Sequence, residues 1–172
     1  MIVRPYQPDD LSILTAINEA SLPAVNSLTP PELGAIIAGS AATLVALDSD
    51  GRHEGFVVCL DQAADYDSRN FRWLQQQFER FYYVDRIALA PEARGRGRGE
   101  ALYRSLLATL LEAGADGTVP LTCEVNERPP NPGSLRFHQR FGFTDVGRQD
   151  FGDKAVIYLA RPLVLPTRKI ST

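Results

Sequence analysis

Arginine and glycine alternate over Arg94-Gly95-Arg96-Gly97-Arg98-Gly99, between two apolar segments with different periodicities. Before this run, residues 81–89 have the apolar and aromatic composition that is typical of a strand. After it, leucines recur every three or four residues over 98–113, which is typical of a helix with one buried face. The sequence therefore predicts a strand, a glycine-rich turn and a helix that begins near residue 98.

The start of this predicted helix is suited to a phosphate group. Backbone N–H groups in the first turn of a helix have no partner within the helix, and the positive end of its dipole lies there. Glycines leave these amides open because they carry no side chain, and they stand here at Gly95, Gly97 and Gly99. Neighbouring positive charge comes from Arg94, Arg96 and Arg98, although only some of these can face a ligand.

Three other phosphate or nucleic-acid motifs fit the sequence less well. A Walker loop requires Lys followed by Ser or Thr at the helix start, and neither is present. A dinucleotide fold has its glycines after the first strand, whereas here they lie in the middle of the chain. Disordered Arg-Gly segments bind RNA, but this run is short and continues into a well-patterned helix.

Strand-like and helix-like segments alternate along the rest of the chain. Strands are predicted at 2–6, 42–48, 55–61, 81–89, 120–126, 143–149 and 155–161. Helices are predicted from residue 8, after Pro30-Pro31, at 71–78, at 98–113 and at 134–141, with Ser134 as N-cap and Gly142 as the stop of the last one. The succession of strand, helix and strand over 81–126 implies a parallel pair with a right-handed crossover and a ligand site at the carboxyl ends of its strands.

Length and composition indicate one globular domain. The chain has 172 residues, of which 44% are hydrophobic, so it can bury a sizeable core. We expect a single domain over 1–163 and a loosely held tail over 164–172. Cys59 and Cys123 lie far apart in apolar runs and are expected to be buried, not to form a metal or redox site. His53 lies among turn-forming residues and is expected to be solvated.

The charge balance argues against nucleic acid or an anionic membrane as the partner. Eighteen basic and 21 acidic residues give a net charge of -3. The opening residues lack the apolar core of a signal peptide, and no apolar run approaches the roughly 20 residues that span a bilayer. We expect a cytoplasmic protein that binds no nucleic acid, membrane or metal.

Two motifs together resemble the GCN5-related N-acetyltransferase (GNAT) superfamily. Arg94, Gly97 and Gly99 fill the family signature Arg/Gln-x-x-Gly-x-Gly/Ala, and residues 87–91 are similar to the strand and turn that precede it. Downstream, Asn126 and residues 131–143 resemble the asparagine, helix and Gly-Phe block that follow the fifth strand. The resemblance covers nearly the whole domain in the right order.

The resemblance implies an α/β fold: a mixed, mostly antiparallel seven-stranded sheet, flanked by helices and splayed between the fourth and fifth strands. Acetyl-coenzyme A is expected in that cleft. By analogy, its pantetheine arm pairs with the backbone of Ile87, Ala88 and Leu89, and its pyrophosphate binds the amides of Arg94, Gly95, Arg96, Gly97, Arg98 and Gly99. The other wall of the cleft is expected to contain Asn126, Asn131, Ser134 and Phe137.

The implied reaction is direct attack of an amine on the thioester in a ternary complex. Such a reaction needs an acceptor for the amine proton and a proton for the leaving thiolate. In many members the acid is a tyrosine after the Phe of the helix, but here His138 takes that place. An imidazolium suits the role. Alternatively, His138 only packs or hydrogen-bonds beside the coenzyme. In that case Tyr82, Tyr83 and Tyr103 are the other candidates for the acid.

Asp85 and Glu124 are the candidates for the base. Asp85 is preferred because alternation along the strand is expected to place it on the same face as Tyr83 and Ile87. However, Asp85 followed by Arg86 is also typical of a structural ion pair. Glu124 lies on the neighbouring strand, and either carboxylate can act directly or through water.

The expected function is transfer of an acetyl group to a primary amine of a small molecule, amino acid, peptide or protein. The alternative is a degenerate GNAT fold that binds acyl-coenzyme A as a sensor or interaction module, and a homodimer is left open. Residues 61–80, between the third and fourth strands, contain Tyr66, Phe71 and Trp73, which form either an acceptor pocket or ordinary core. Acidic residues in the same segment are consistent with a cationic acceptor or with a solvated loop.

Overall fold

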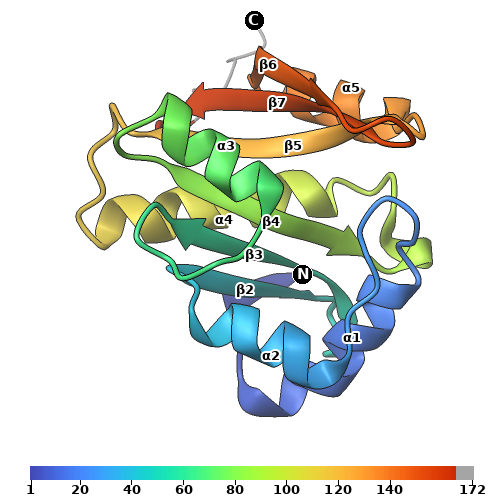
Figure 1. Cartoon of the computed structure of the whole chain (residues 1–172). Coiled ribbons are helices and arrows are strands. Elements are labelled where there is room, and N and C mark those ends of the chain that lie inside the picture. Colours follow the sequence, from blue (N-terminus) through green and yellow to red (C-terminus); the bar gives the residue numbers. More distant parts are fainter. Residues whose placement is uncertain (166–172) are drawn as a thin grey trace, which may run out of the picture.

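The computed structural model describes residues 1–165, so most of the predicted tail, residues 166–172, lies outside the described part. Seven strands form one sheet in the order β1-β2-β3-β4-β5-β7-β6 (Figure 1). They are β1 (Ile2–Pro5), β2 (Ala42–Leu47), β3 (His53–Asp61), β4 (Tyr82–Leu89), β5 (Pro120–Arg128), β6 (Thr144–Asp150) and β7 (Ala155–Pro162). Only β4 and β5 run parallel; the other neighbours are antiparallel. The predicted fold is confirmed.

Helices cover both faces of the sheet, so that each face packs against its own core. They are α1 (Leu11–Glu19), α2 (Pro30–Ala38), α3 (Arg69–Gln77), α4 (Arg98–Glu112) and α5 (Pro132–Arg140), with 3-10 turns η1 (Pro8–Asp10) and η2 (Pro91–Ala93). In Figure 1, α1, α2 and α3 lie in front of the sheet, and α4 and α5 lie behind it. Val57 and Val58 alternate along β3, and they pack into the rear and front cores respectively.

The ladder between β4 and β5 is short. It contains two residue pairs, Tyr82 with Leu121 and Tyr83 with Thr122. On its other edge β4 stays paired with β3 as far as Leu89. Beyond Tyr83, therefore, β4 has no strand partner on the β5 side, and Figure 1 shows the two strands diverging there. This is the predicted splay between the fourth and fifth strands.

Local sequence signals explain where the helices around the splay begin and end. Ser68 caps α3 by accepting a hydrogen bond from the Phe71 amide at 3.4 Å. The predicted cap of α5 is wrong, because Asn131 accepts from the Ser134 amide at 3.1 Å and the helix starts at Pro132. Proline suits this first position since its missing N–H is not needed there. Gly142, at φ +92°, ends the helix as predicted.

His53 differs from its predicted role as a solvated turn residue. It is the first residue of β3, and its Nε2 lies 2.8 Å from Asp10 Oδ1. Arg4 donates two hydrogen bonds of 2.8 Å to the same carboxylate. Asp10 thereby joins the start of α1 to β1 and β3. Cys59 and Cys123 are both buried and unbridged, as expected.

Within residues 1–165, no helix combines the length and the apolar character that a membrane-spanning segment needs.

Candidate active site

The glycine-rich turn opens α4 at the mouth of the splay. Gly95 and Gly97 have φ values of +73° and +75°, in the left-handed region that glycine adopts without steric cost. Gly97 is the N-cap of α4, which has 15 residues. A Cβ placed on either glycine would meet nothing within 4 Å. The turn therefore presents open backbone next to a helix N-terminus, which fits a phosphate group.

The three arginines of the turn have different surroundings. Arg94 donates from Nε to the Leu89 carbonyl at 3.2 Å and from Nη2 to the Ala20 carbonyl at 3.0 Å, so it ties the end of β4 to the end of α1. Arg98 is paired with Glu54 at 2.7 Å. Arg96 is exposed. Of the three side chains, only that of Arg96 extends into solvent without one of these protein contacts.

Helix α5 lies against the first turn of α4. Gly99 is buried under Phe137, and a Cβ at residue 99 would lie 2.9 Å from the Phe137 ring. Phe137 also stacks on Tyr103, at 5.7 Å between ring centroids. Asn131 and Ser134 occupy the start of α5, where they interact with each other. Phe137 thus packs against α4 from α5, with Asn131 and Ser134 at the start of the same helix; their assignment to the second wall of the cleft remains a prediction.

Asn126 is placed differently from these wall residues. Its neighbour Val125 packs into the rear core, and since side chains alternate along a strand, Asn126 points to the front. Its Nδ2 lies 3.5 Å from the Pro23 carbonyl, in the loop between α1 and α2. Ile87, Ala88 and Leu89 lie on the open part of β4, next to the turn.

Asp85 sits at an irregularity of β4, where the register with β3 shifts. Its Oδ1 accepts a 2.6 Å hydrogen bond from Tyr66, and its Oδ2 accepts one of 2.7 Å from Arg86. Both side chains of the pair are almost fully buried, at 4% and 2% exposure. Arg86 is held further by Asn18 and Asn26 at 2.7 and 2.9 Å. Asp85 is therefore committed to a structural ion pair, although it borders the site.

Glu124 has one carboxylate oxygen that is hydrogen-bonded and one that is not. Its Oε1 accepts hydrogen bonds from Asn70 at 2.9 Å and Tyr83 at 3.1 Å, whereas the buried Oε2 has no partner among the described residues. Burial, and to a smaller extent the charge of Asp85, raise the pKa of Glu124 to about 7. A buried carboxylate with one open oxygen and a pKa near neutrality suits proton transfer.

His138 lies in an aromatic cluster between α4 and α5 and is only 3% exposed. Its Nδ1 lies 2.8 Å from the Ser134 carbonyl, which can only accept, so the ring proton is assigned to Nδ1. Nε2 then accepts from the Tyr103 hydroxyl at 2.8 Å. Burial lowers the pKa of His138 to about 4, so the ring is neutral at pH 7. This arrangement does not favour the imidazolium acid that the sequence suggested.

Asn70 and Tyr158 lie beside Glu124, a placement that the sequence did not reveal. Asn70 donates to Glu124, and the Tyr158 hydroxyl donates to Asn70 Oδ1 at 2.8 Å. The two residues are 88 positions apart in the chain. An asparagine near the start of a helix and a tyrosine in a strand carry no distinguishing pattern, so only their meeting in the fold identifies them.

A sheet that opens between two parallel strands, beside a glycine turn at a helix N-terminus, defines an acyl-coenzyme A transferase fold. The acetyltransferase (GNAT) family model matches residues 14–143, most of the chain, and the chain belongs to this family. No curated protein matches it in sequence.

Solved structures share the fold at low sequence identity. Ard1 from Thermoplasma volcanium has a TM-score of 0.73 and 18% identity, over 95% of this chain and 97% of that one. The ribosomal-protein-S18-alanine N-acetyltransferase from Escherichia coli gives 0.71 and 15%, over 99% of both chains. A phosphinothricin acetyltransferase from Sinorhizobium meliloti, in complex with AcCoA, gives 0.68 and 23%, over 98% of this chain and 94% of that one. At these identities the likeness shows the fold alone.

Proposed function

We propose that this protein transfers the acetyl group of acetyl-coenzyme A to a primary amine by direct attack within a ternary complex. The observation that carries the proposal is Glu124, which lies on the strand that borders the splay and whose buried Oε2 has no partner within residues 1–165. The coenzyme supplies the thioester. The chain supplies a cleft that positions it, a base and a surface for the acceptor.

The coenzyme is proposed to bind at the residues that the resemblance named. The open edge of β4 at Ile87, Ala88 and Leu89 would pair with the pantetheine amides as a further strand does. The amides of residues 94–99 would hold the pyrophosphate, since left-handed glycines leave them uncovered. Phe137, Asn131 and Ser134 lie across from them on α5. Asn126 faces the opposite side of the sheet, where the acceptor would approach.

Glu124 is the proposed base in preference to Asp85. Both oxygens of Asp85 are occupied, and a proton placed on it would disrupt the pair with buried Arg86. Glu124 has a free oxygen, and its pKa near 7 leaves much of it ionised at neutral pH. In the reaction the amine nitrogen bonds to the carbonyl carbon, its proton passes to Glu124, and the carbon–sulfur bond breaks.

The leaving thiolate is proposed to take its proton from water, without a protein acid. His138 has its only proton committed to the Ser134 carbonyl, and Tyr103 donates to His138. Tyr83 donates to Glu124. A thiol has a pKa of about 8.5, so its thiolate leaves readily without prior protonation. The absence of a protein acid therefore slows this reaction less than it would slow the loss of an alkoxide.

Calorimetry with acetyl-coenzyme A and a screen of amines for thiol release test the proposal. Gly97→Glu should weaken coenzyme binding by at least about tenfold, because the carboxylate would project into the open space above the turn. Gly97→Ala is the matched control, since it strains the same left-handed position without adding charge. Binding without thiol release from any amine would support the degenerate sensor instead. Absence of binding by the wild type would refute both.

A further inference from the structure

Helix α3, which lies between β3 and β4 in the chain, is fixed on the front of the sheet. Phe71 and Leu74 anchor it in the core, at 1% and 0% exposure. On its adjoining side, Trp73 stacks flat on Tyr158 of β7, with 3.9 Å between ring centroids and 6° between planes. A Cβ on Gly147 of β6 would lie 2.5 Å from this indole, so Gly147 makes room for it. The backbone of the helix is therefore fixed against the front of the sheet.

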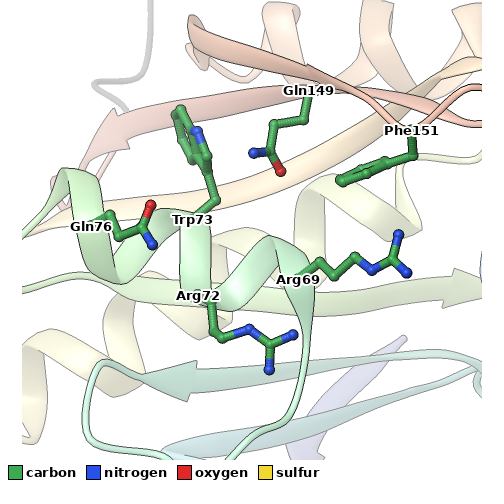
Figure 2. A pocket seen from close by; sticks show the side chains of 6 residues that line it. All are labelled: Arg69, Arg72, Trp73, Gln76, Gln149 and Phe151. Atoms are coloured by element: carbon green, nitrogen blue, oxygen red, sulfur yellow. The ribbon is translucent and has the colours of Figure 1, made fainter.

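A pocket of about 220 Å³ lies between α3 and the end of the β6–β7 hairpin. Figure 2 shows Trp73 and Phe151 on two sides of it, with Gln149 between them. Its lining consists of Arg69, Arg72, Trp73, Gln76, Gln149 and Phe151. Two cations, two amides and two aromatic rings thus surround a space that no acidic residue lines.

Arg69 is available for an anion. Its guanidinium lies over the Phe151 ring at 5.4 Å from the centroid, and within residues 1–165 it has no ion-pair partner. Stacking on a ring uses the face of the guanidinium and leaves its edge N–H groups for a carboxylate. Arg72 is paired with Asp67, but both side chains are largely exposed, at 56% and 90%. Such a pair is weak and exchangeable.

The pocket adjoins the proposed base through Tyr158 and Asn70, whose side chains lie between them. Gln149, which lines the pocket, has its Oε1 3.0 Å from the Tyr158 hydroxyl. Tyr158 donates to Asn70, and Asn70 donates to Glu124. Arg69 and Asn70 are adjacent on α3, so one helix places a cation at the pocket and an amide at the base.

We propose that this pocket binds the carboxylate of the acceptor, so that the preferred acceptors are amines that also carry a carboxylate. The inference rests on the proposed function, because Glu124 marks where the amine must react. Of the two alternatives that the sequence left open for the acidic residues of this segment, the arginine lining favours a solvated loop over attraction of a cationic acceptor. The carboxylate can belong to a free amino acid or to an acidic side chain in a peptide.

Matched acceptor pairs test the inference. One arm compares ω-amino carboxylates of increasing length with alkylamines of the same length, and a second compares Gly-Asp with Gly-Asn. The carboxylate should lower KM by about tenfold, the usual effect of one charge-assisted hydrogen bond. Arg69→Gln should remove this difference in KM while leaving unchanged the KM of the alkylamines, which carry no carboxylate. Preference for the free amino carboxylates identifies a small-molecule acceptor, and preference for Gly-Asp identifies a peptide acceptor.

Arg52→Gln is the control, since it removes the same charge from the exposed β2–β3 turn. It should leave unchanged the KM of acceptors with a carboxylate and the KM of acceptors without one. Equal kcat/KM for acceptors with and without a carboxylate, or an equal effect of Arg69→Gln on both, would overturn the inference. If no amine releases thiol, the proposed function fails separately. Calorimetry with 6-aminohexanoate then decides the pocket: binding lost in Arg69→Gln supports it, and absence of binding by the wild type refutes it.

Discussion

At the residue scale, Glu124 determines the pH dependence that we expect of the reaction. Because Glu124 must be ionised to accept a proton and has a pKa of about 7, kcat/KM should rise with pH through that value. Glu124→Gln should lower kcat by about 100-fold or more and abolish the rise near pH 7, while coenzyme affinity stays unchanged. Steady-state kinetics from pH 5.5 to 9 measure both effects.

Asp85→Asn provides the comparison for this prediction. It leaves Arg86 buried with a weaker partner, so its main effect should be on the free energy of unfolding. A Glu124→Gln variant that kept the rise near pH 7 would show that the base lies elsewhere.

His138 gives a second prediction at this scale. Since the ring is neutral and its proton is bound to the Ser134 carbonyl, His138→Ala should leave the alkaline side of the pH–rate profile unaltered. The variant should lower the free energy of unfolding by about 1 to 3 kcal/mol, because the buried Tyr103 hydroxyl loses its acceptor. Urea unfolding and pH–rate profiles measure the two effects. Disappearance of the alkaline limb, with activity lowered most at the pH values where the imidazolium would be protonated, would instead identify His138 as the acid.

At the element scale, α3 depends on a glycine in a distant strand. Gly147→Leu should push Trp73 off Tyr158, because its Cβ would overlap the rigid indole. We expect a loss of about 1 to 3 kcal/mol in stability and a raised KM for the acceptor, with unchanged affinity for acetyl-coenzyme A. Gly39→Ala is the control, because its Cβ would make only ordinary contacts at 3.8 Å. A coenzyme affinity that fell along with acceptor binding would contradict the division between front and rear faces.

At the scale of the whole molecule, two buried groups make opposite contributions to stability below pH 7. The pKa of His138 falls from 6.5 to about 4, so the unfolded state binds more protons and stability is lost as pH falls through this range. The pKa of Glu124 rises from 4.5 to about 7, so the folded state binds more protons and stability is gained over pH 7 to 4.5. Each shift corresponds to at most about 3 kcal/mol. The two effects should therefore largely offset each other in the wild type.

Single variants should separate these contributions. As pH falls from 6.5 to 4.5, the Glu124→Gln variant should lose stability more steeply than the wild type. Over the same fall in pH, the His138→Gln variant should gain stability. The free energy of unfolding in urea at several pH values measures both slopes. The pKa of Asp10 is lowered from its ordinary value of 3.8, so its effect on the free energy of unfolding falls below that pH and outside this window. Parallel slopes in the wild type and both variants would contradict the two shifted pKa values.

The sequence alone predicted the sheet and the glycine-rich turn at the start of the long helix. Hydrophobic periodicity predicted all seven strands and the long helix, and the glycines of residues 94–99 predicted the turn that opens it. These features are readable because they are local: strand alternation, helix periodicity and positive φ each depend on residues close together in the chain. Phe137 was named only by the family resemblance, as a residue of the cleft wall, and its contact with Gly99 is visible only in the structure.

Only the tertiary structure distinguished the two candidate carboxylates and determined the surroundings of His138. The sequence favoured Asp85 over Glu124 as the base, but the fold gave both oxygens of Asp85 a partner and left one oxygen of Glu124 without one among the described residues. His138 changed from a candidate acid to a neutral acceptor because burial disfavours its charged form. Asn70 meets Tyr158 from 88 residues away. Such properties arise from burial and from contacts between distant segments, and these exist only once the chain has folded.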